Sequence, residues 1–534
     1  MKRNIINILI TIVIGFITFY LTLPAINLNN PKFYLFLSFL IIVYGLLDAV
    51  TANKIEIIKK GQKGKFKVSS IGGKFPICLI IVGCLFVLGI IINFICSPVF
   101  NAKSYQQRIT VVDGNFTEDI AEVNFNQLPL LDKASSQVLG DRVMGEISEL
   151  VSQFYVSNLY TQINYNNDIL RVTPLEYADF FKWLSNKKNG VVGYITVNSV
   201  NGESKLTRLD KGMKYVSSAY FNDNLERKLR FSYPTENFGK ISFEIDNEGK
   251  PYYIVPTIKY TAFGLKAKVT GVIIFDPVTG DSEKYKLDEI PTWVDIAYSA
   301  SLIIEQVDDW GTYKNGFWNS IFGQKDVVNT TEGYNYLAMN DDVYLYTGIT
   351  SVVSDESNLG FILTNMRTGK TTFYSVPGAE EYSAMSSAEG QVQDMRYEST
   401  FPLLINLNGR PTYLVSLKDS NGLVKMYGFI DVKDYQKVSV TDASKGIIAA
   451  KDNYLKAIKQ EAKDEELVIE EIKIDSISSA TINGYTYYYF SSGNKKFKAS
   501  ISLSDKLPFI KNGDTLKVGY YSSEREIIDI EKIY

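Results

Sequence analysis

Residues Ile5–Ile26 read IINILITIVIGFITFYLTLPAI, a run of 22 residues without a charged side chain. A helix of this length crosses a hydrocarbon core of about 30 Å, and a soluble protein rarely keeps a helix apolar on every face for as long. A cleavable signal peptide is the competing interpretation, but its apolar stretch is only about 7–15 residues and ends at a small-residue cleavage site. No such site follows Ile26. The run therefore predicts a membrane-spanning helix.

Two further apolar runs, Phe33–Val50 and Phe75–Val99, follow within the first hundred residues. Lys2 and Arg3 precede the first run, and the loop Thr51–Lys74 holds seven lysines against one acid. By the positive-inside rule the N-terminus and this loop are cytoplasmic. The sequence thus predicts a three-span membrane anchor over residues 1–100, with residues 101–534 on the extracytoplasmic side of a cell membrane.

The charge of the chain divides at the same boundary. Residues 1–100 hold ten Lys/Arg and two Asp/Glu, which leaves 46 basic and 57 acidic residues in 101–534. An acidic bulk argues against a nucleic-acid partner, which requires a basic surface. The chain of 534 residues contains no histidine, so mechanisms and metal sites that need imidazole are excluded. Its three cysteines all lie in the third apolar run at spacings that form no ligand cluster, and we predict no metal and no cofactor.

Residues 101–190 show helical signals. Apolar residues recur at spacings of three and four over Asp141–Tyr160, and Thr173–Pro174 has the form of a helix start that leads into Tyr177–Leu184. These signals predict a helical collar between the anchor and the strands that follow. The alternative for this region is a helix-in-groove site for a partner.

After Gly190 the pattern changes to short strands separated by Gly, Asn and Asp turns, which predicts a first α+β module over 191–295 and a second over 296–440. The phrase GKPYYIV at 249–255 returns as GRPTYLV at 409–415, and the turns DPVTG and NMRTG also correspond. The two phrases occur in opposite order in the two halves. A tandem duplication and a shared vocabulary of hairpin turns therefore both stay open.

The phrase GKPYYIV, the strand GVIIFDPVTG and a neighbouring helix resemble the PepSY module, a small helix-on-antiparallel-sheet domain of exported bacterial proteins. More broadly, segments such as EIPTWVD and GYNYLAMNDDVYLYTGITSV resemble a family of uncharacterised Gram-positive membrane proteins, some of which carry a colicin-V-production label. The PepSY resemblance implies regulation or inhibition of a neighbouring exported enzyme, or ligand sensing. It supplies no catalytic residues.

The C-terminal part is predicted from charge and strand spacing. Residues 441–470 form an amphipathic, densely charged helix linker, and residues 471–534 contain five strand signals, Ile472–Ile477 first. Five short strands with polar turns predict a small barrel of OB or SH3 type. Such a barrel binds peptide, glycan or protein, or serves only as a packing domain.

Catalytic motifs are weak throughout the chain. The two Ser-x-x-Lys patterns, at Ser185–Lys188 and Ser492–Lys495, fall at a helix end and in a hairpin turn, so no catalytic residue is predicted. The best cluster for a glycan or partner surface combines acids with aromatic rings: Asp308, Asp309, Trp310, Tyr313 and Trp318. Its alternatives are a structural helix end and a carboxylate pair for glycoside hydrolysis.

Together these features predict a non-catalytic membrane-anchored scaffold or regulator of an envelope component, with a membrane and an envelope protein as partners. The first alternative is a receptor module for cell-wall glycan or peptide, and the second is a carboxylate-dependent cell-wall hydrolase. An exposed groove holding Trp310 and Trp318 would favour the receptor. A buried Trp310 with dispersed acids would favour the scaffold.

Overall fold

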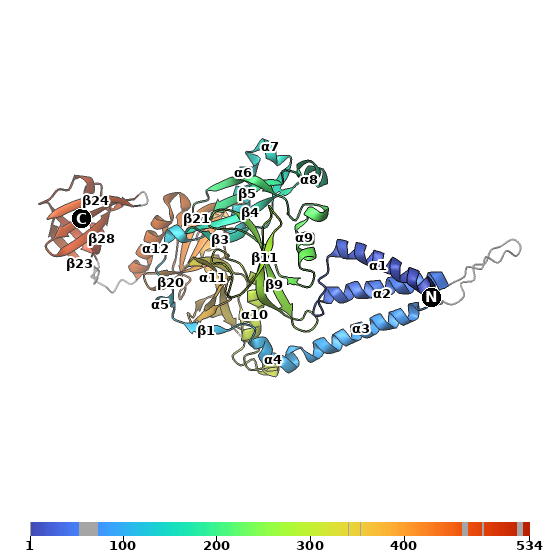
Figure 1. The fold of residues 1–534 in the computed structure, drawn as a ribbon. Helices are drawn as coiled ribbons and strands as arrows, with labels where there is room; N and C mark the ends of the chain where they lie inside the picture. Colours follow the sequence, from blue (N-terminus) through green and yellow to red (C-terminus); the bar gives the residue numbers. More distant parts are fainter. Residues whose placement is uncertain are drawn as a thin grey trace. The chain divides into compact units, whose positions relative to one another are not determined.

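The structure is a computed structural model that describes residues 2–52, 73–339, 341–352, 354–461, 468–482, 485–520 and 527–534. The chain forms two compact units, Met1–Lys451 and Asp452–Tyr534 (Figure 1). Most of the lysine-rich loop, and part of the linker predicted at 441–470, lie outside the described residues.

The three apolar runs form the helices α1 (Lys2–Thr22), α2 (Pro31–Ala52) and α3 (Phe75–Ile95). Each helix is long and apolar enough to cross a membrane, and at most 17% of the apolar window of any of them is buried inside the protein. The three predicted apolar helices are thus present, and their length and composition fit membrane spans. The third ends at Ile95, before the predicted Val99, because Pro98 opens a new helix, α4 (Pro98–Gln106).

One buried carboxylate joins the ends of the three apolar helices. Asp48 of α2 accepts a hydrogen bond from the Arg3 guanidinium of α1 at 3.3 Å and from the backbone N–H of Lys74 at 2.8 Å, at the start of α3. Gly45 lets α3 approach closely, because a Cβ there would lie 3.0 Å from the Cβ of Cys78. Asp48 therefore has a structural role in packing the helices.

Residues 133–442 repeat one arrangement four times: a helix, two short strands that pair in turn with one long strand, and two further antiparallel strands. Repeat 1 (133–213) contains α6 (Lys133–Gly145), β2 (Phe154–Val156), β3 (Thr161–Tyr165), β4 (Asp168–Tyr177), β5 (Val191–Asn198) and β6 (Ser204–Met213). Repeat 2 (225–286) contains α9 (Leu225–Ser232), β7 (Asn237–Phe238), β8 (Ser242–Ile245), β9 (Pro251–Tyr260), β10 (Ala267–Phe275) and β11 (Ser282–Lys286).

Repeat 3 (300–374) and repeat 4 (381–442) follow the same order. Their elements are α10 (Ala300–Thr312), β12 (Val328–Thr330), β13 (Asn335–Met339), β14 (Asp342–Ser351), β15 (Ser354–Asn365), β16 (Thr371–Tyr374), then α11 (Glu381–Gly390), β18 (Glu398–Ser399), β19 (Leu403–Leu407), β20 (Arg410–Lys418), β21 (Val424–Asp431) and β22 (Val438–Asp442). The strands β1 (Val111–Gly114) and β17 (Gly378–Ala379) extend the sheet of repeat 3. The predicted α+β region with antiparallel sheets is thus present.

The repeat explains why the two sequence phrases recur in opposite order. GKPYYIV and GRPTYLV both begin the long strand, in repeats 2 and 4, and Gly249 and Gly409 hold φ at +82° and +76° in the turn before it. DPVTG and NMRTG both form the turn before the last strand, in repeats 2 and 3. Each phrase therefore occupies one position of the repeat, and different pairs of repeats share different phrases.

Repeat 2 is covered on both faces of its sheet. Along β9 the side chains of Tyr253 and Val255 enter a core shared with repeat 1, whereas Ile254 between them packs with residues 290–297 on the opposite face. Alternate residues of one strand point to opposite faces, so burial on both sides requires an unbroken apolar run. This accounts for the sequence YYIV, which shows no alternation.

The range 101–190 is not the helical collar that its sequence predicts. It contains α4, α5 (Phe116–Asp119), α6, α7 (Ser148–Val151) and α8 (Phe180–Asn186), together with β1 to β4. Thr173 and Pro174, which have the form of a helix start, lie inside β4, where the Thr173 hydroxyl donates to Ser157 O at 2.8 Å. The helix begins later, with Asp179 capping the N–H of Lys182 at 2.9 Å.

The second unit contains the end of the helix α12 (Ile447–Glu461) and one sheet of six strands around its own apolar core. The strands are β23 (Val468–Lys473), β24 (Ser476–Ile482), β25 (Tyr485–Ser492), β26 (Lys495–Ser500), β27 (Thr515–Tyr520) and β28 (Ile527–Ile533). The strand order runs from β23 through β27, β28, β26 and β25 to β24, and in the described residues no pairing joins β23 to β24. A closed barrel is therefore not found there.

Candidate functional site

The five residues predicted as a glycan or partner surface all lie on α10 or just after it, but their side chains diverge. Asp308 accepts hydrogen bonds from the backbone N–H and the hydroxyl of Thr330, both at 2.9 Å, and so fixes the start of the sheet in repeat 3. Burial raises the pKa of Asp308 above its ordinary value. This carboxylate is part of the internal structure of repeat 3.

Asp309 belongs to an ion cluster with Arg108, Lys266 and Glu305. Arg108 pairs with Asp309 and, at 3.2 Å, with Glu305, while Lys266 lies 3.2 Å from Asp309 and 2.8 Å from Glu305. Burial acts to lower the pKa of Lys266, but the two carboxylates outweigh it and raise that pKa. The cluster joins the segment after α4, the start of β10 and the helix α10.

The two tryptophans have different environments. Trp310 packs against the apolar core of repeat 3, with its ring 6.4 Å from the ring of Phe373. Trp318 is 63% exposed and stacks on Phe322, which is 78% exposed, at 5.9 Å. Tyr313 packs edge-on against Tyr105 at 6.0 Å. The five residues are therefore close in sequence, but their side chains do not form one surface.

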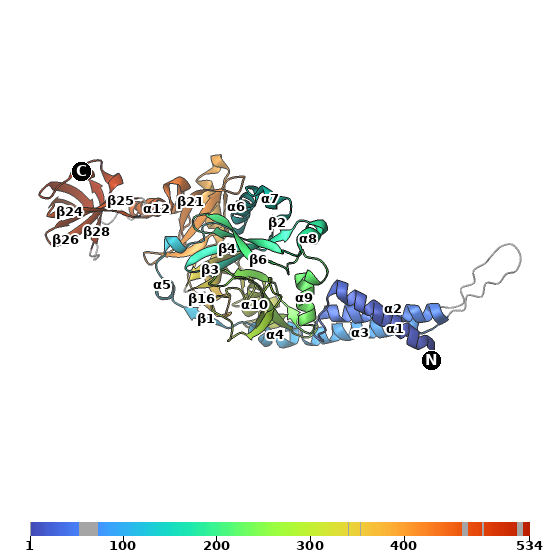
Figure 2. The same ribbon diagram turned by 45° about the horizontal axis from the view of Figure 1, so that its top comes forward.

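A junction that the sequence analysis missed connects repeat 2 to the apolar helices (Figures 1 and 2). Arg230 of α9, itself buried, donates from Nε to Leu23 O, just after α1, at 3.1 Å. Its Nη1 also donates to the carbonyl oxygens of Tyr233 at 3.1 Å and Glu236 at 2.6 Å. Burial lowers the pKa of Arg230 to about 10.

Two further contacts strengthen this junction. The guanidinium of Arg227 lies 4.2 Å from the centre of the Tyr20 ring in α1, a cation–π contact. Before α2, the buried side chain of Asn30 donates to Asn237 Oδ1 at 2.7 Å. Repeat 2 is thus held to α1 and to the start of α2 by directional contacts.

The turn between β9 and β10 contacts the other two apolar helices. Phe263 donates its N–H to Asn93 Oδ1 at 3.1 Å, and Asn93 Nδ2 donates back to Phe263 O at 3.4 Å. The Phe263 ring packs edge-on against Tyr34 of α2, with centroids 4.8 Å apart. Gly264, at φ +73°, lies against Pro31. An isolated asparagine in the third apolar run was the sequence signal for this contact.

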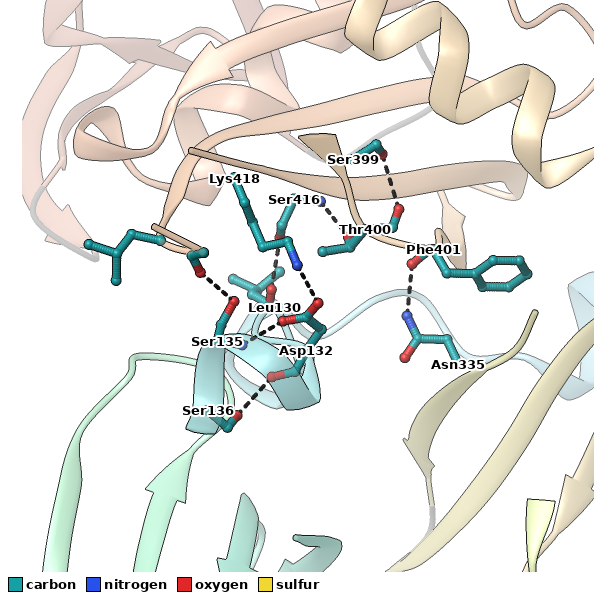
Figure 3. Close-up of polar contacts among 12 residues, drawn as sticks. Leu130, Asp132, Ser135, Ser136, Asn335, Ser399, Thr400, Phe401, Ser416 and Lys418 are labelled. Carbon is teal, nitrogen blue, oxygen red and sulfur yellow. Dashed lines mark hydrogen bonds and ion pairs between the residues drawn. The ribbon is translucent and has the colours of Figure 1, made fainter. Parts of the chain in front are cut away.

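The repeats are also joined to each other, as Figure 3 shows around Asp132. Asp132 caps α6 through the N–H of Ser135 at 2.8 Å and pairs with Lys418 of repeat 4 at 2.6 Å. Burial opposes ionisation of Asp132, but Lys418 and Ser135 outweigh it and lower its pKa. The Ser135 hydroxyl of α6 donates to Gly422 O of repeat 4 at 2.8 Å. Repeat 1 therefore contacts repeat 4 as well as repeat 2, so the four repeats do not form an open string.

Among the described residues no group of three or more metal-ligating side chains occurs, and the three cysteines are free. The chain matches no protein-family model and no curated protein. A comparison with solved structures finds a crystal structure of an ACO/RPE65 chimera, at 8% identity and a TM-score of 0.14, over 71% of this chain. The chain spans 65% of the length of that structure, and the likeness is too weak to indicate a shared fold.

Proposed function

We propose that this chain is a non-catalytic, membrane-anchored scaffold or regulator that holds an envelope component beside the membrane. In this proposal α1–α3 cross the membrane with the N-terminus in the cytoplasm, and residues 101–534 are extracytoplasmic. The lysines at the N-terminus and between the second and third runs support that orientation.

The observation that carries the proposal is the junction of repeat 2 with the apolar helices. A receptor on a flexible tether needs no defined angle to the membrane. Here, Arg230, Asn237 and Phe263 of repeat 2 each make directional hydrogen bonds across the junction, to three different places in or next to α1, α2 and α3. These contacts fix the position of the repeats relative to the anchor, which is the property that a scaffold requires.

The positions of the residues predicted as a glycan or partner surface also favour the scaffold over both alternatives. A receptor that stacks sugars on Trp310 and Trp318 needs the two rings in one groove, whereas Trp310 packs against the core. A hydrolase needs two carboxylates on either side of the bond that is cleaved. Asp308 instead accepts a hydrogen bond from Thr330, and Asp309 pairs with the cations of the ion cluster.

The repeats supply surfaces on which a partner could bind. The last strands of repeats 1, 2 and 4, β6, β11 and β22, stand at the ends of their strand orders. An edge strand offers unpaired backbone groups to an added strand. The order of a helix followed by an antiparallel sheet is also that of the PepSY module, whose resemblance implies regulation of an exported neighbour.

The test is in-cell photo-crosslinking of the full-length protein from its native membrane. A photoreactive amino acid replaces Lys205 in β6 or Glu283 in β11, two exposed edge positions, and Lys370, an exposed turn position, serves as the control. Mass spectrometry then identifies the adducts. One recurrent envelope protein captured from an edge position and not from the control would support the scaffold. Capture of glycan alone would overturn it and favour the receptor module.

A further inference from the structure

A cavity of about 590 Å³ lies between α4 and the β9–β10 turn. Its lining includes four cationic side chains, and among the described residues that line it none is acidic. The cations are Lys103, Arg108, Lys266 and Lys268. Residues 101–534 carry an excess of acids, 57 against 46 basic residues, so this concentration of positive charge opposes the trend of the chain.

The four cations fall into two pairs. Arg108 and Lys266 are paired with Glu305 and Asp309 in the ion cluster. Lys103 and Lys268 are exposed, and no ion pair with either is present in the described part of the chain. These two lysines are therefore available to an anionic ligand.

The cavity adjoins the end of the third apolar helix. The helix α4, which lines the cavity, begins at Pro98, three residues after α3 ends. The Tyr105 hydroxyl of α4 donates to Cys96 O at 2.8 Å. Phe100, which also lines the cavity, packs edge-on against Phe94 in the last turn of α3 at 5.4 Å. When α3 crosses the membrane, these contacts place the cavity at the level of the lipid headgroups.

An exposed apolar patch lies beside the same helix end. Trp318, Ile321 and Phe322 are all more than half exposed. The segment that carries them follows Tyr313, whose ring contacts Tyr105 of α4. Tryptophan and phenylalanine next to lysine are typical of segments that lie in the membrane interface. A large exposed apolar patch in water would need another explanation.

We propose that this cavity binds the phosphate group of an anionic phospholipid in the membrane leaflet that contacts α4, with Trp318 and Phe322 inserted at the boundary of headgroups and acyl chains. Lys103 and Lys268 supply the attraction for the phosphate. The proposal commits to lipid because the cavity continues the surface that α3 already presents to the membrane. It depends on the membrane anchor and not on the scaffold role, so loss of lipid binding and loss of a protein partner are separate results.

The first test measures retained lipid on the full-length protein by native mass spectrometry in detergent with added phosphatidylglycerol or phosphatidylcholine. Wild type should retain phosphatidylglycerol preferentially. The double variant Lys103→Ala/Lys268→Ala should bind it about 25-fold more weakly, since each lysine near a membrane surface contributes about fivefold. The matched control Lys370→Ala/Lys433→Ala removes two exposed lysines from turns of repeats 3 and 4 and should bind as wild type does.

Equal retention by the Lys103/Lys268 variant and wild type would overturn the proposal. So would displacement of phosphatidylglycerol by an equal concentration of glycerol 3-phosphate, because the cavity would then take a soluble phosphate and not a lipid. A thermal unfolding curve identical to that of wild type shows that the variant is folded.

The second test uses tryptophan fluorescence in vesicles whose lipids carry brominated acyl chains. All four tryptophans, 183, 293, 310 and 318, lie outside α1–α3, so the spans contribute no signal. Wild type should be quenched, and the variant Trp318→Phe should lose most of that quenching. Quenching of equal extent in the two proteins would show that Trp318 does not reach the membrane.

Discussion

Asn93, in the last turn of α3, and Phe263, at the tip of the β9–β10 turn, exchange two hydrogen bonds at 3.1 and 3.4 Å. The side-chain amide of Asn93 satisfies both the N–H and the carbonyl of one backbone residue. An asparagine on an apolar helix is costly in lipid unless its polar groups are paired. The contact therefore gives a reason for a polar residue within the third apolar run.

Replacing Asn93 by Leu should loosen this turn. The change leaves the N–H and carbonyl of Phe263 without their partners, at a cost of about 1–3 kcal/mol to the docking of repeat 2. Hydrogen exchange of the full-length protein should show faster exchange over residues 261–266. The control Cys84→Leu alters an exposed residue of the same helix and should leave this exchange unchanged. Equal protection in Asn93→Leu and wild type would mean that Tyr34 and Pro31 alone hold the turn.

Asp309→Asn should destabilise the protein through the ion cluster. The change leaves Arg108 and Lys266 with Glu305 alone, and breaking a largely buried ion pair costs several kcal/mol when no partner remains. With one carboxylate left, we expect the free energy of unfolding, measured in urea, to fall by about 2 kcal/mol. Glu289→Gln, which removes an exposed pair with Lys286, should cause no measurable change. If both variants unfold as wild type does, the cluster does not stabilise the fold.

Much of the architecture could be predicted from local sequence. Apolar length alone identified α1, α2 and α3, and Gly-containing turns identified several of the strands between 191 and 440, among them β9, β10 and β19. The fourfold repeat could not be identified in this way. Strand pairing is non-local, and two repeats share the phrase beginning at Gly249 while a different pair shares the turn that ends at Gly280.

The wrong prediction of a helix start at Thr173 has a physical cause. Thr173–Pro174 matches a helix start, but buried neighbours in β4 and pairing with β5 override that local preference. Asp308 and Asp309 are a different case, because they are adjacent in sequence and consecutive residues of a helix point about 100° apart. The divergence of these two carboxylates was therefore predictable, whereas the cations that Asp309 meets come from distant parts of the chain.

Trp310→Ala and Trp318→Ala should differ in their effect on stability, because Trp310 packs against the core and Trp318 is exposed. Trp310 packs beside the core of repeat 3, so its truncation should cost about 2 kcal/mol of stability, less than a fully buried tryptophan. Truncation of the exposed Trp318 should change stability by no more than about 0.5 kcal/mol. Urea unfolding of each variant gives both values. If Trp318→Ala left the fold intact but abolished retention on purified cell wall, the glycan-receptor alternative would replace the scaffold.

The buried carboxyl group of Glu244 should make stability depend on pH. Glu244 of β8 accepts hydrogen bonds from the backbone N–H groups of Asp295 at 2.8 Å and Ile296 at 3.1 Å, and from the hydroxyl of Ser242 at 3.0 Å. Burial outweighs these donors and raises the pKa of Glu244 from 4.5 to about 7. Between these two values the folded protein binds more protons than the unfolded chain, so folding is favoured at the acidic end.

The contribution of Glu244 to the free energy of unfolding is thus fully present below about pH 4.5 and is lost as the pH rises to about 7. The urea midpoint of wild type should fall over this interval. Glu244→Gln cannot ionise at this position, so its midpoint should fall less steeply; it should still fall, because burial also raises the pKa of Glu176 to about 7 and raises the pKa of the neighbouring Asp295. Glu248→Gln, in the exposed turn after β8, should keep the full slope of wild type. A slope in Glu244→Gln as steep as that of Glu248→Gln would show that Glu244 is already ionised in the folded protein at acidic pH.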